Sequence, residues 1–253
     1  IVGVHNAETR AEEVLRTNTL VVMETLEWMK ESGCERLFYA STSETYAGGV
    51  NIGVVPVPTS EQVPIVFDDL QNPRFSYAIS KLWGEAAVQY CAGQFGFRAI
   101  TGRFHNVYGP RMGTAHVIPE LSLRILDGER PLRVRSVEQT RAFCYVDDAV
   151  EAILRLMDCP AAAGHIVHIG NDSEEVTIAE LVDVIREVSG VPFEVQPLPP
   201  PPGSVPRRCP DIGLLRTLTG FAPKVDLLQG VGMTFAWYLA HRETAPEGPR
   251  GSK

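Results

Sequence analysis

The 253-residue sequence lacks the marks of a membrane protein or a nucleic-acid-binding protein. No apolar run approaches the roughly 18 residues that a membrane-spanning helix needs, and the first residues show no signal-peptide pattern. Lysine and arginine form no run that could follow a phosphate backbone, and 31 acidic residues outnumber 23 basic ones, for a formal net charge of −8. We therefore expect neither a membrane nor a nucleic acid as a partner.

Cysteine is too sparse and too scattered to suggest a scaffold. The five cysteines form no Cys-x-x-Cys pair, and their number is odd. This pattern gives no support to a zinc site or a disulfide framework, so we expect no metal and a reducing, cytoplasmic setting. The cysteines are Cys34, Cys91, Cys144, Cys159 and Cys209.

What is present predicts an α/β fold. Short apolar runs that suit buried strands alternate with segments whose apolar residues recur at helical spacing. This alternation is typical of βαβ units and a parallel sheet, here with a more irregular, mixed C-terminal part. The strands are expected at Arg36–Ala40, Arg98–Arg103, Leu132–Val134, His165–Ile169 and Phe193–Val195, and the helices at Ala11–Glu31, Ser76–Phe95, Val117–Leu126, Val146–Met157, Thr177–Ser189 and Leu227–His241.

Local signals refine this outline. Thr177 and Glu180 form a capping box that opens a helix. The segment 47–72 has little periodicity and predicts a long loop, which in a compact domain is often functional. The proline-rich segment 197–206 cannot be a helix or a central strand. Gly230-Val-Gly232 lies in a predicted helix without a third glycine, so we interpret it as a packing feature.

Tyr77 and Lys81 form the first candidate catalytic pair. Residues four apart share a helix face, and an ammonium beside a phenol favours the phenolate, which lowers the tyrosine pKa toward the range of a general base. The pair alone is a weak signal, because a Tyr-x-x-x-Lys spacing also arises by chance.

Hydroxyl-rich and basic segments follow two strand candidates, at the sheet edge where parallel folds bind ligands. Segment 41–46 offers hydroxyls and Glu44 as a possible acid or base, although it also suits a plain polar turn. Segment 103–111 contains His105, which could contact a ligand or simply pack. Arginine forks at Arg141 and Arg208 suit diphosphates, yet either one alone would more often be a surface ion pair.

Taken together, in this order and spacing, these motifs resemble the extended short-chain dehydrogenase/reductase family of NAD-dependent nucleotide-sugar epimerases, dehydratases and decarboxylases, from about Ala7 to Tyr238. The resemblance implies a Rossmann-type fold, bound NAD and a nucleotide-diphosphate sugar as substrate. It also implies a homodimer through a four-helix bundle, to which each chain gives the helices at 11–31 and 76–95.

The resemblance assigns catalytic and cofactor-binding roles. Tyr77 would take the proton from the sugar C4 hydroxyl, with Thr42 on the proton path. Lys81 would hold the nicotinamide ribose and lower the Tyr77 pKa. Asn18 and His105 match positions beside the cofactor, where Tyr77 and Lys81 also contact it.

The same resemblance assigns the substrate contacts and narrows the reaction. Asn106, Arg141 and Arg208 match residues that grip the substrate diphosphate, and Ser43 is placed against the sugar. Thr42-Ser43-Glu44 and Arg208-Cys-Pro-Asp are similar to UDP-glucuronate decarboxylases, with Glu44 in a catalytic position. Ser43 stands where 4,6-dehydratases carry an acidic group, so it cannot protonate a departing hydroxyl. The expected reaction oxidises C4, releases carbon dioxide from the β-keto acid and then reduces C4 again.

The front of the family pattern is absent from the sequence. The family begins with a strand and Gly-x-x-Gly-x-x-Gly, whereas by register Ile1–Asn6 falls just after the fourth strand of the usual sheet. We therefore expect that the first βαβ units, at about 30 residues each, are missing. Residues 1–112 would be the C-terminal portion of the NAD-binding Rossmann domain. Residues 113–253 would be mainly the nucleotide-sugar-binding domain, with some segments returning to the Rossmann sheet.

Two other functions stay open. A 4-epimerase for nucleotide-diphosphate sugars would use the same C4 oxidation, and the long 47–72 loop is expected to shape the sugar pocket toward either reaction. A non-catalytic, truncated binding module without the cofactor half is the alternative from another class. A simple alcohol or steroid dehydrogenase would share Tyr77 and Lys81 but would not explain Arg141 and Arg208.

Overall fold

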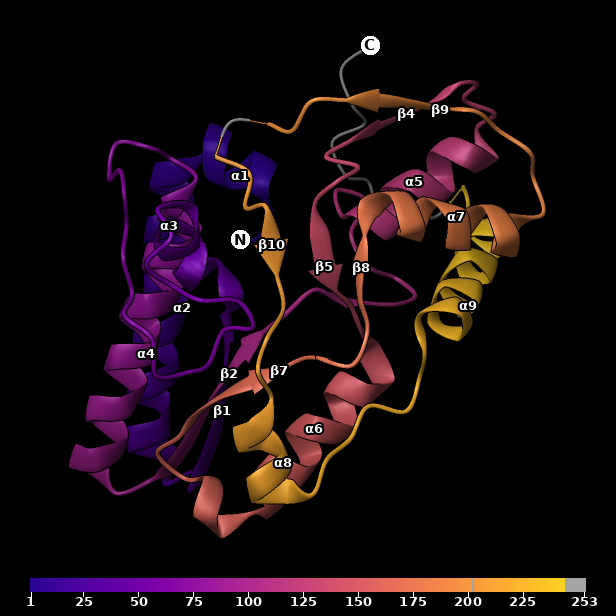
Figure 1. Cartoon of the computed structure of the whole chain (residues 1–253). Coiled ribbons are helices and arrows are strands. Elements are labelled where there is room, and N and C mark those ends of the chain that lie inside the picture. Colours follow the sequence, from indigo (N-terminus) through magenta and orange to yellow (C-terminus); the bar gives the residue numbers. More distant parts are fainter. Residues whose placement is uncertain (202, 244–253) are drawn as a thin grey trace.

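Three parallel strands form the sheet that organises the first part of the chain (Figure 1). β1 (Arg36–Thr42) pairs with β2 (Arg98–Phe104), and β2 pairs with β7 (Ile166–Ile169). The register places Thr42 beside Phe104, so the strands reach one edge of the sheet with their carboxyl ends together. The predicted α/β fold with a parallel sheet is confirmed.

The computed structural model describes residues 1–201 and 203–243; residue 202 of the proline-rich segment and residues 244–253 lie outside the described part. The helices are α1 (Val4–Thr9), α2 (Ala11–Ser32), α3 (Ala47–Asn51), α4 (Phe75–Phe95), α5 (Val117–Leu126), α6 (Val146–Asp158), α7 (Ile178–Ser189), α8 (Gly213–Thr219) and α9 (Leu227–Ala240), with 3-10 helices η1 (Ser43–Tyr46) and η2 (Pro160–Ala162). The further strands are β3 (Val107–Tyr108), β4 (Leu132–Arg135), β5 (Thr140–Ala142), β6 (Cys144–Tyr145), β8 (Glu175–Thr177), β9 (Val195–Leu198) and β10 (Arg207–Arg208).

Helices cover both faces of the sheet. α2 and α4 pack together and bury Leu26 and Val88 against Ala99 of β2. The next residue of β2, Ile100, faces the opposite cluster, which α6 and α8 build with Leu156 and other apolar side chains. Successive strand residues point to opposite faces, so this single step in sequence separates the two layers. Within the described ranges, no helix is both long enough and apolar enough to cross a membrane.

A second core lies in the later part of the chain, where α5, α7 and α9 pack with the two-stranded sheet β4-β9 (Figure 1). Leu132, Leu181 and Val231 are fully buried in it. Gly230 lets α9 approach Tyr108, because a Cβ there would lie 2.1 Å from the Tyr108 hydroxyl. The interpretation of this glycine as a packing feature is therefore confirmed.

The long elements lie where the periodicity predicts them, and the differences have local causes. The prediction of an irregular loop from residue 47 is wrong at its start, because α3 forms there and packs Gly48 against the backbone of Val66. β9 begins at Val195 and includes Pro197, which an edge strand paired only with β4 accepts. The strands of two or three residues and the short helices α1 and α8 carry no periodic signal of their own.

The predicted capping box of α7 is confirmed and gives a stability prediction. Thr177 Oγ1 accepts a hydrogen bond from the Glu180 backbone N–H at 3.0 Å, and Glu180 Oε2 accepts one from the Thr177 N–H at 2.7 Å. Thr177→Ala should lower the free energy of unfolding by about 1 kcal/mol in urea titration, since it leaves helix donors unpaired. Thr217→Ala in α8 is the control, because the Thr217 hydroxyl only donates back to the Gly213 carbonyl. Equal stability of wild type and Thr177→Ala would contradict a role for the cap.

Candidate active site

Four segments meet at the carboxyl edge of the β1–β2 pair. β1 ends at Thr42 and continues directly into η1, because the Thr42 hydroxyl accepts a hydrogen bond from the Glu44 N–H at 3.2 Å. The first turns of α4 bring Tyr77 and Lys81 to the same place, and β2 ends just before His105. The segment at β10 closes the site from the second part of the chain.

The structure brings Thr42, Tyr77 and Lys81 together. Thr42 hydrogen-bonds to the Tyr77 hydroxyl. Lys81 Nζ lies 5.9 Å from the centroid of the Tyr77 ring and donates to the Ala40 carbonyl at 2.9 Å. A hydroxyl, a phenol and an ammonium therefore line one corner of the site, which is the arrangement that proton transfer to and from a substrate hydroxyl requires.

The pKa of Tyr77 differs from the sequence-based expectation. Burial raises the pKa of Tyr77 to about 12; the hydrogen bond from Thr42 lowers it, and the charge of Glu44 adds to the rise. Lys81 is not among the groups that shift the pKa of Tyr77 in this structure, where its ammonium donates to the Ala40 carbonyl. Burial also lowers the pKa of Lys81.

Glu44 and Arg208 form an ion pair inside the site. Arg208 Nη1 lies 2.6 Å from Glu44 Oε1, and both side chains are largely covered. Burial alone would raise the pKa of Glu44, but the charge and hydrogen bond of Arg208, joined by the charges of Arg74 and Arg141, hold it below its usual value. Glu44 is therefore a carboxylate within a cluster of three arginines.

This arginine cluster carries excess positive charge. Burial, with the charge of Arg208 added to it, lowers the pKa of Arg141 to about 9. Its guanidinium donates to the carbonyl of Val205 at 2.8 Å and to Gln139 Oε1 at 3.0 Å. Arg74 was not singled out from the sequence, although it stands three residues before Tyr77; its Nε is buried without a hydrogen-bond partner in the described structure. Three guanidinium groups around one carboxylate suit an anionic ligand such as a diphosphate.

Asn106 and Asn18 make separate hydrogen bonds, one to the end of β5 and the other to α4. Asn106 adopts a left-handed backbone with φ of 42°, a conformation that asparagine tolerates, and its Nδ2 donates to the Ala142 carbonyl at 3.1 Å. It thereby ties the end of β2 to β5. Asn18 belongs to α2, and its Nδ2 donates to Ser80 Oγ at 3.1 Å, one residue before Lys81; its expected contact with the cofactor stays a prediction.

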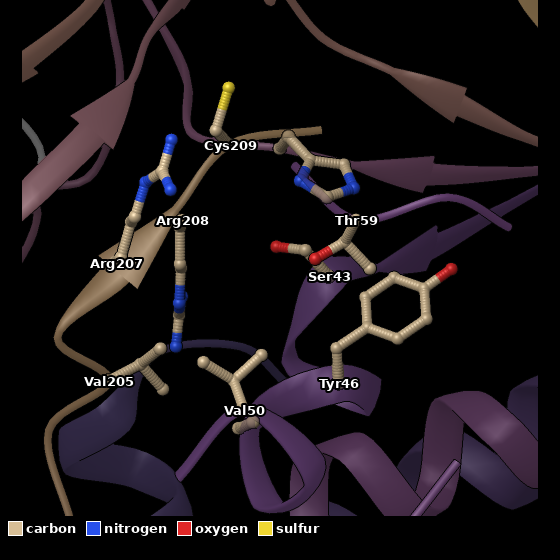
Figure 2. A pocket seen from close by; sticks show the side chains of 10 residues that line it. Ser43, Tyr46, Val50, Thr59, Val205, Arg207, Arg208 and Cys209 are labelled. Carbon is tan, nitrogen blue, oxygen red and sulfur yellow. The ribbon is translucent and has the colours of Figure 1, made fainter. Parts of the chain in front are cut away.

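A pocket opens beside η1, with about 250 Å³ of empty space when the adjoining open solvent is included. Figure 2 shows Ser43 and Thr59 on one side of it and Arg208 on the other. The Thr59 N–H donates to the Cys209 carbonyl at 2.9 Å, and the Thr59 carbonyl accepts from the Asp211 N–H at 2.7 Å. The long loop after α3 therefore adds a wall to the pocket and is tied to the segment that carries Arg208.

His105 lines the same pocket and is 2% exposed. Neither of its ring nitrogens has a hydrogen-bond partner among the described residues. Burial, followed by the charges of His168, Arg208 and Arg103, lowers its pKa well below the usual value, so the ring is neutral. A neutral imidazole offers one donor and one acceptor, which a polar group entering the pocket would satisfy.

A buried polar network lies beneath these residues and was not foreseen from the sequence. Arg103 donates to both carboxylate oxygens of Glu85, at 2.9 and 2.6 Å, and also to the Tyr46 hydroxyl at 2.5 Å. Ser41 hydrogen-bonds to Glu85, and the Tyr46 hydroxyl lies 2.8 Å from His168 Nε2. In the sequence, only the charged residues Arg103 and Glu85 within otherwise apolar segments could have indicated this network.

Comparison with known proteins agrees with this geometry. The model of the NAD-dependent epimerase/dehydratase family matches residues 1–170. A UDP-N-acetyl-alpha-D-glucosaminuronate decarboxylase of Bacillus cytotoxicus is 32% identical over 248 residues, covering 94% of this chain and 74% of the relative. A putative GDP-L-fucose synthase 2 of Oryza sativa subsp. japonica is 31% identical over 248 residues, covering 94% of this chain and 69% of the relative. The solved UDP-glucose 4-epimerase of Thermotoga maritima, in a structure with UDP-glucose, has a TM-score of 0.83 and 26% identity, covering 95% of this chain and 75% of that one.

The fold is thus the Rossmann-type fold of extended short-chain dehydrogenases, as the sequence predicts. The chain belongs to the NAD-dependent epimerase/dehydratase family. The expected family of NAD-dependent enzymes is confirmed.

The described residues fit the nicotinamide end of NAD. Tyr77 and Lys81 present a phenol and an ammonium at the carboxyl edge of the sheet, and His105 presents two buried, unpartnered nitrogens to the adjacent pocket. These are the three residues that would hold that end of the cofactor. In residues 1–201 and 203–243, no group of three or more His, Cys, Asp or Glu side chains is gathered for a metal ion.

The Glu44–Arg208 pair gives a titration prediction. Arg208→Gln should raise the pKa of Glu44, because burial raises this pKa and the charge of Arg208 no longer opposes that effect. NMR titration of the carboxyl carbon in labelled protein measures the Glu44 pKa. In the wild type, the lowered pKa stabilises the fold above pH 4.5, the ordinary value, and this contribution is lost as the pH falls through the lowered pKa.

Arg207→Gln is the matched control for this titration. Arg207 pairs with Glu175 at 2.7 Å, so its removal should raise the pKa of Glu175 and leave that of Glu44 in place. An unchanged Glu44 pKa in Arg208→Gln would contradict the ion pair.

Proposed function

We propose that this protein is a nucleotide-sugar-modifying enzyme that oxidises C4 of a uronic acid sugar and releases carbon dioxide from it. The observation that carries the proposal is the Glu44–Arg208 pair, since Glu44 follows Thr42 by two residues and Thr42 is hydrogen-bonded to Tyr77. Residues 1–112 would face the cofactor, and residues 113–253 would mainly hold the nucleotide sugar. The decarboxylase named among its relatives supports this choice.

Tyr77 is the proposed base. Tyr77 acts in its phenolate form: the phenolate accepts the proton of the C4 hydroxyl and becomes a phenol, and Thr42, hydrogen-bonded to Tyr77, stabilises the phenolate and shares the proton path. Lys81 adds positive charge on the same helix face and orients the nicotinamide ribose. Bound NAD supplies the hydride acceptor at C4 and the hydride donor that completes the cycle.

The arginine cluster is the proposed diphosphate site. Arg141 is fixed by backbone carbonyls, and the charges of Arg74 and Arg141 both act on Glu44, so a diphosphate entering beside Glu44 would meet preformed donors. Asn106, held in its left-handed conformation, would contact the same group. Burial of the site raises the strength of these charge-assisted contacts.

Decarboxylation follows from the residues around the sugar. A ketone at C4 makes the C6 carboxylate part of a β-keto acid, and loss of carbon dioxide leaves its electron pair as an enolate. Ser43 and Arg208 provide the hydroxyl and the positive charge that stabilise developing negative charge there. Ser43 cannot serve as the acid of a dehydratase. Reprotonation and hydride return then complete the turnover.

The product distinguishes the candidate functions. NAD-loaded protein supplied with UDP-glucuronate should give a nucleotide sugar that has lost carbon dioxide, measured by mass spectrometry. Tyr77→Phe should lower turnover by about a hundredfold or more. Tyr238→Phe is the control, because the Tyr238 hydroxyl bonds to the Met112 carbonyl, outside the site and the proposed dimer interface. Survival of Tyr77→Phe activity within tenfold would contradict the role of Tyr77 as the base.

An unchanged mass with altered sugar stereochemistry would instead identify a 4-epimerase, which the Thermotoga maritima neighbour makes the second candidate. Absence of turnover, together with absence of bound NAD in native mass spectrometry, would favour a non-catalytic binding module. We also propose that the protein acts in the cytoplasm, as its scattered cysteines predict.

The apolar faces of α2 and α4 are the proposed dimer interface. Val21 and Trp28 are 60% and 56% exposed on α2, and Tyr90 is 78% exposed on α4. Residues seven apart share a helix face, and such exposed apolar faces mark interaction sites. Two copies would form a four-helix bundle.

Native mass spectrometry should therefore show a dimer, and Trp28→Glu should shift it toward monomer. Leu154→Glu is the control, because Leu154 is 60% exposed on α6, away from this face. A monomeric wild type at micromolar concentration, or equal loss of dimer in both variants, would overturn the proposed interface.

A further inference from the structure

In the buried network beneath η1, the donor and the acceptor of each hydrogen bond around Tyr46 and His168 can be assigned. His168 Nδ1 lies 3.0 Å from the Asp211 carbonyl, which can only accept, so this nitrogen carries the proton. Nε2 of the neutral ring is then an acceptor, and the Tyr46 hydroxyl donates to it at 2.8 Å. Burial lowers the pKa of His168 to about 4, so the neutral ring persists at ordinary pH.

The other side of the Tyr46 hydroxyl is held equally firmly. Arg103 donates to the hydroxyl oxygen at 2.5 Å while two other guanidinium nitrogens grip Glu85. The Arg103 and Glu85 side chains are 4% and 3% exposed. The phenol of Tyr46 therefore sits between a fixed donor and a fixed acceptor.

Tyr46 connects this anchor to the reacting end of the site. It is the last residue of η1, whose first two residues are Ser43 and Glu44. Its ring also stacks on His105, with centroids 6.2 Å apart and an interplanar angle of 29°. A shift of the Tyr46 ring would move the turn and the pocket wall together.

We propose that Tyr46 is a positioning residue: its hydroxyl, held between Arg103 and His168, fixes Ser43, Glu44 and the His105 ring against the sugar. The proposal rests on the proposed function for its kinetic readout, although the ordering of η1 is measurable without turnover. His168 is the partner that defines the acceptor side of this link.

The surroundings of His168 favour the neutral acceptor form. Arg103 and the His105 ring, whose centroid lies 4.4 Å away, face it from the end of β2. Glu61, from the loop before α4, accepts from the His168 backbone N–H at 2.9 Å and lies 3.8 Å from Nδ1. Asp211 contributes the carbonyl and a carboxylate that oppose the effect of burial.

Tyr46→Phe tests the link. It should lower kcat by about ten- to a hundredfold, because catalytic geometry is lost, while KM for the nucleotide sugar changes less than threefold. Hydrogen exchange of the peptide covering residues 42–51 should become faster. Tyr238→Phe is the control, since it removes another buried hydroxyl hydrogen bond, to the Met112 carbonyl, outside the network.

A second pair of variants separates positioning from simple stability. His168→Gln keeps one acceptor and one donor and should retain most of the activity and the slow exchange of residues 42–51. His168→Leu keeps neither and should resemble Tyr46→Phe. Equal kcat in wild type and Tyr46→Phe, or equal defects in the Gln and Leu variants, would overturn the proposal.

The two proposals fail in different ways. If the wild type turns over no nucleotide sugar but Tyr46→Phe still accelerates exchange at 42–51, the proposed function fails and the anchoring of η1 stands. If turnover is normal and exchange at 42–51 is the same in every variant, the proposed function stands and the anchoring role is wrong.

Discussion

The buried Arg103–Glu85 ion pair is the constraint on which the active-site region depends. It joins the end of β2 to the middle of α4, with donor-acceptor distances of 2.9 and 2.6 Å. Two charges removed from water are costly, and loss of one partner from such a pair costs about 3–5 kcal/mol. The pair is completed by Ser41 and Tyr46, so the ends of β1 and η1 are tied to the same point. The ends of β1 and η1, the end of β2 and the middle of α4 therefore all contact one charged centre.

Charge is distributed unevenly around this centre. The inner pair is neutral overall, whereas the outer cluster places Arg74, Arg141 and Arg208 around the single carboxylate of Glu44. The inner ion pair holds the surrounding segments in position. The excess positive charge of the outer arginine cluster attracts an anion. The neutral His105 lies between the two and carries unpaired hydrogen-bonding capacity without charge. A neutral, buried ion pair beneath an outer cluster of positive charge suits a site that binds an anionic ligand while its own side chains stay in place.

The sequence predicts the long elements and the segments that meet, but not their coupling. α2, α4, α5 and α7 follow from helical periodicity and caps, and the parallel sheet follows from alternation, so Thr42, Tyr77 and Lys81 could be placed at one edge. The rise of the Tyr77 pKa could not be predicted, because it depends on burial, which is tertiary. The Tyr46–His168 contact joins residues 122 positions apart and carries no local pattern. Arg74 was missed for the same reason: its role appears only when Glu44 is folded beside it.

The tie between the long loop and β10 has a consequence for how such a site diversifies. Thr59 is bonded on both sides, to Cys209 and Asp211, so the pocket wall and the arginine segment move as one unit. Thr42 and Tyr77 belong to β1 and α4, and the loop reaches the buried network beside them at Glu61, which accepts from the His168 backbone N–H. Substitutions in this loop that leave Glu61 and Arg74 in place can therefore change the pocket wall at Thr59 without altering the contacts of Thr42 and Tyr77. The contacts that shape the pocket wall are thus largely distinct from those that bring Thr42 and Tyr77 together.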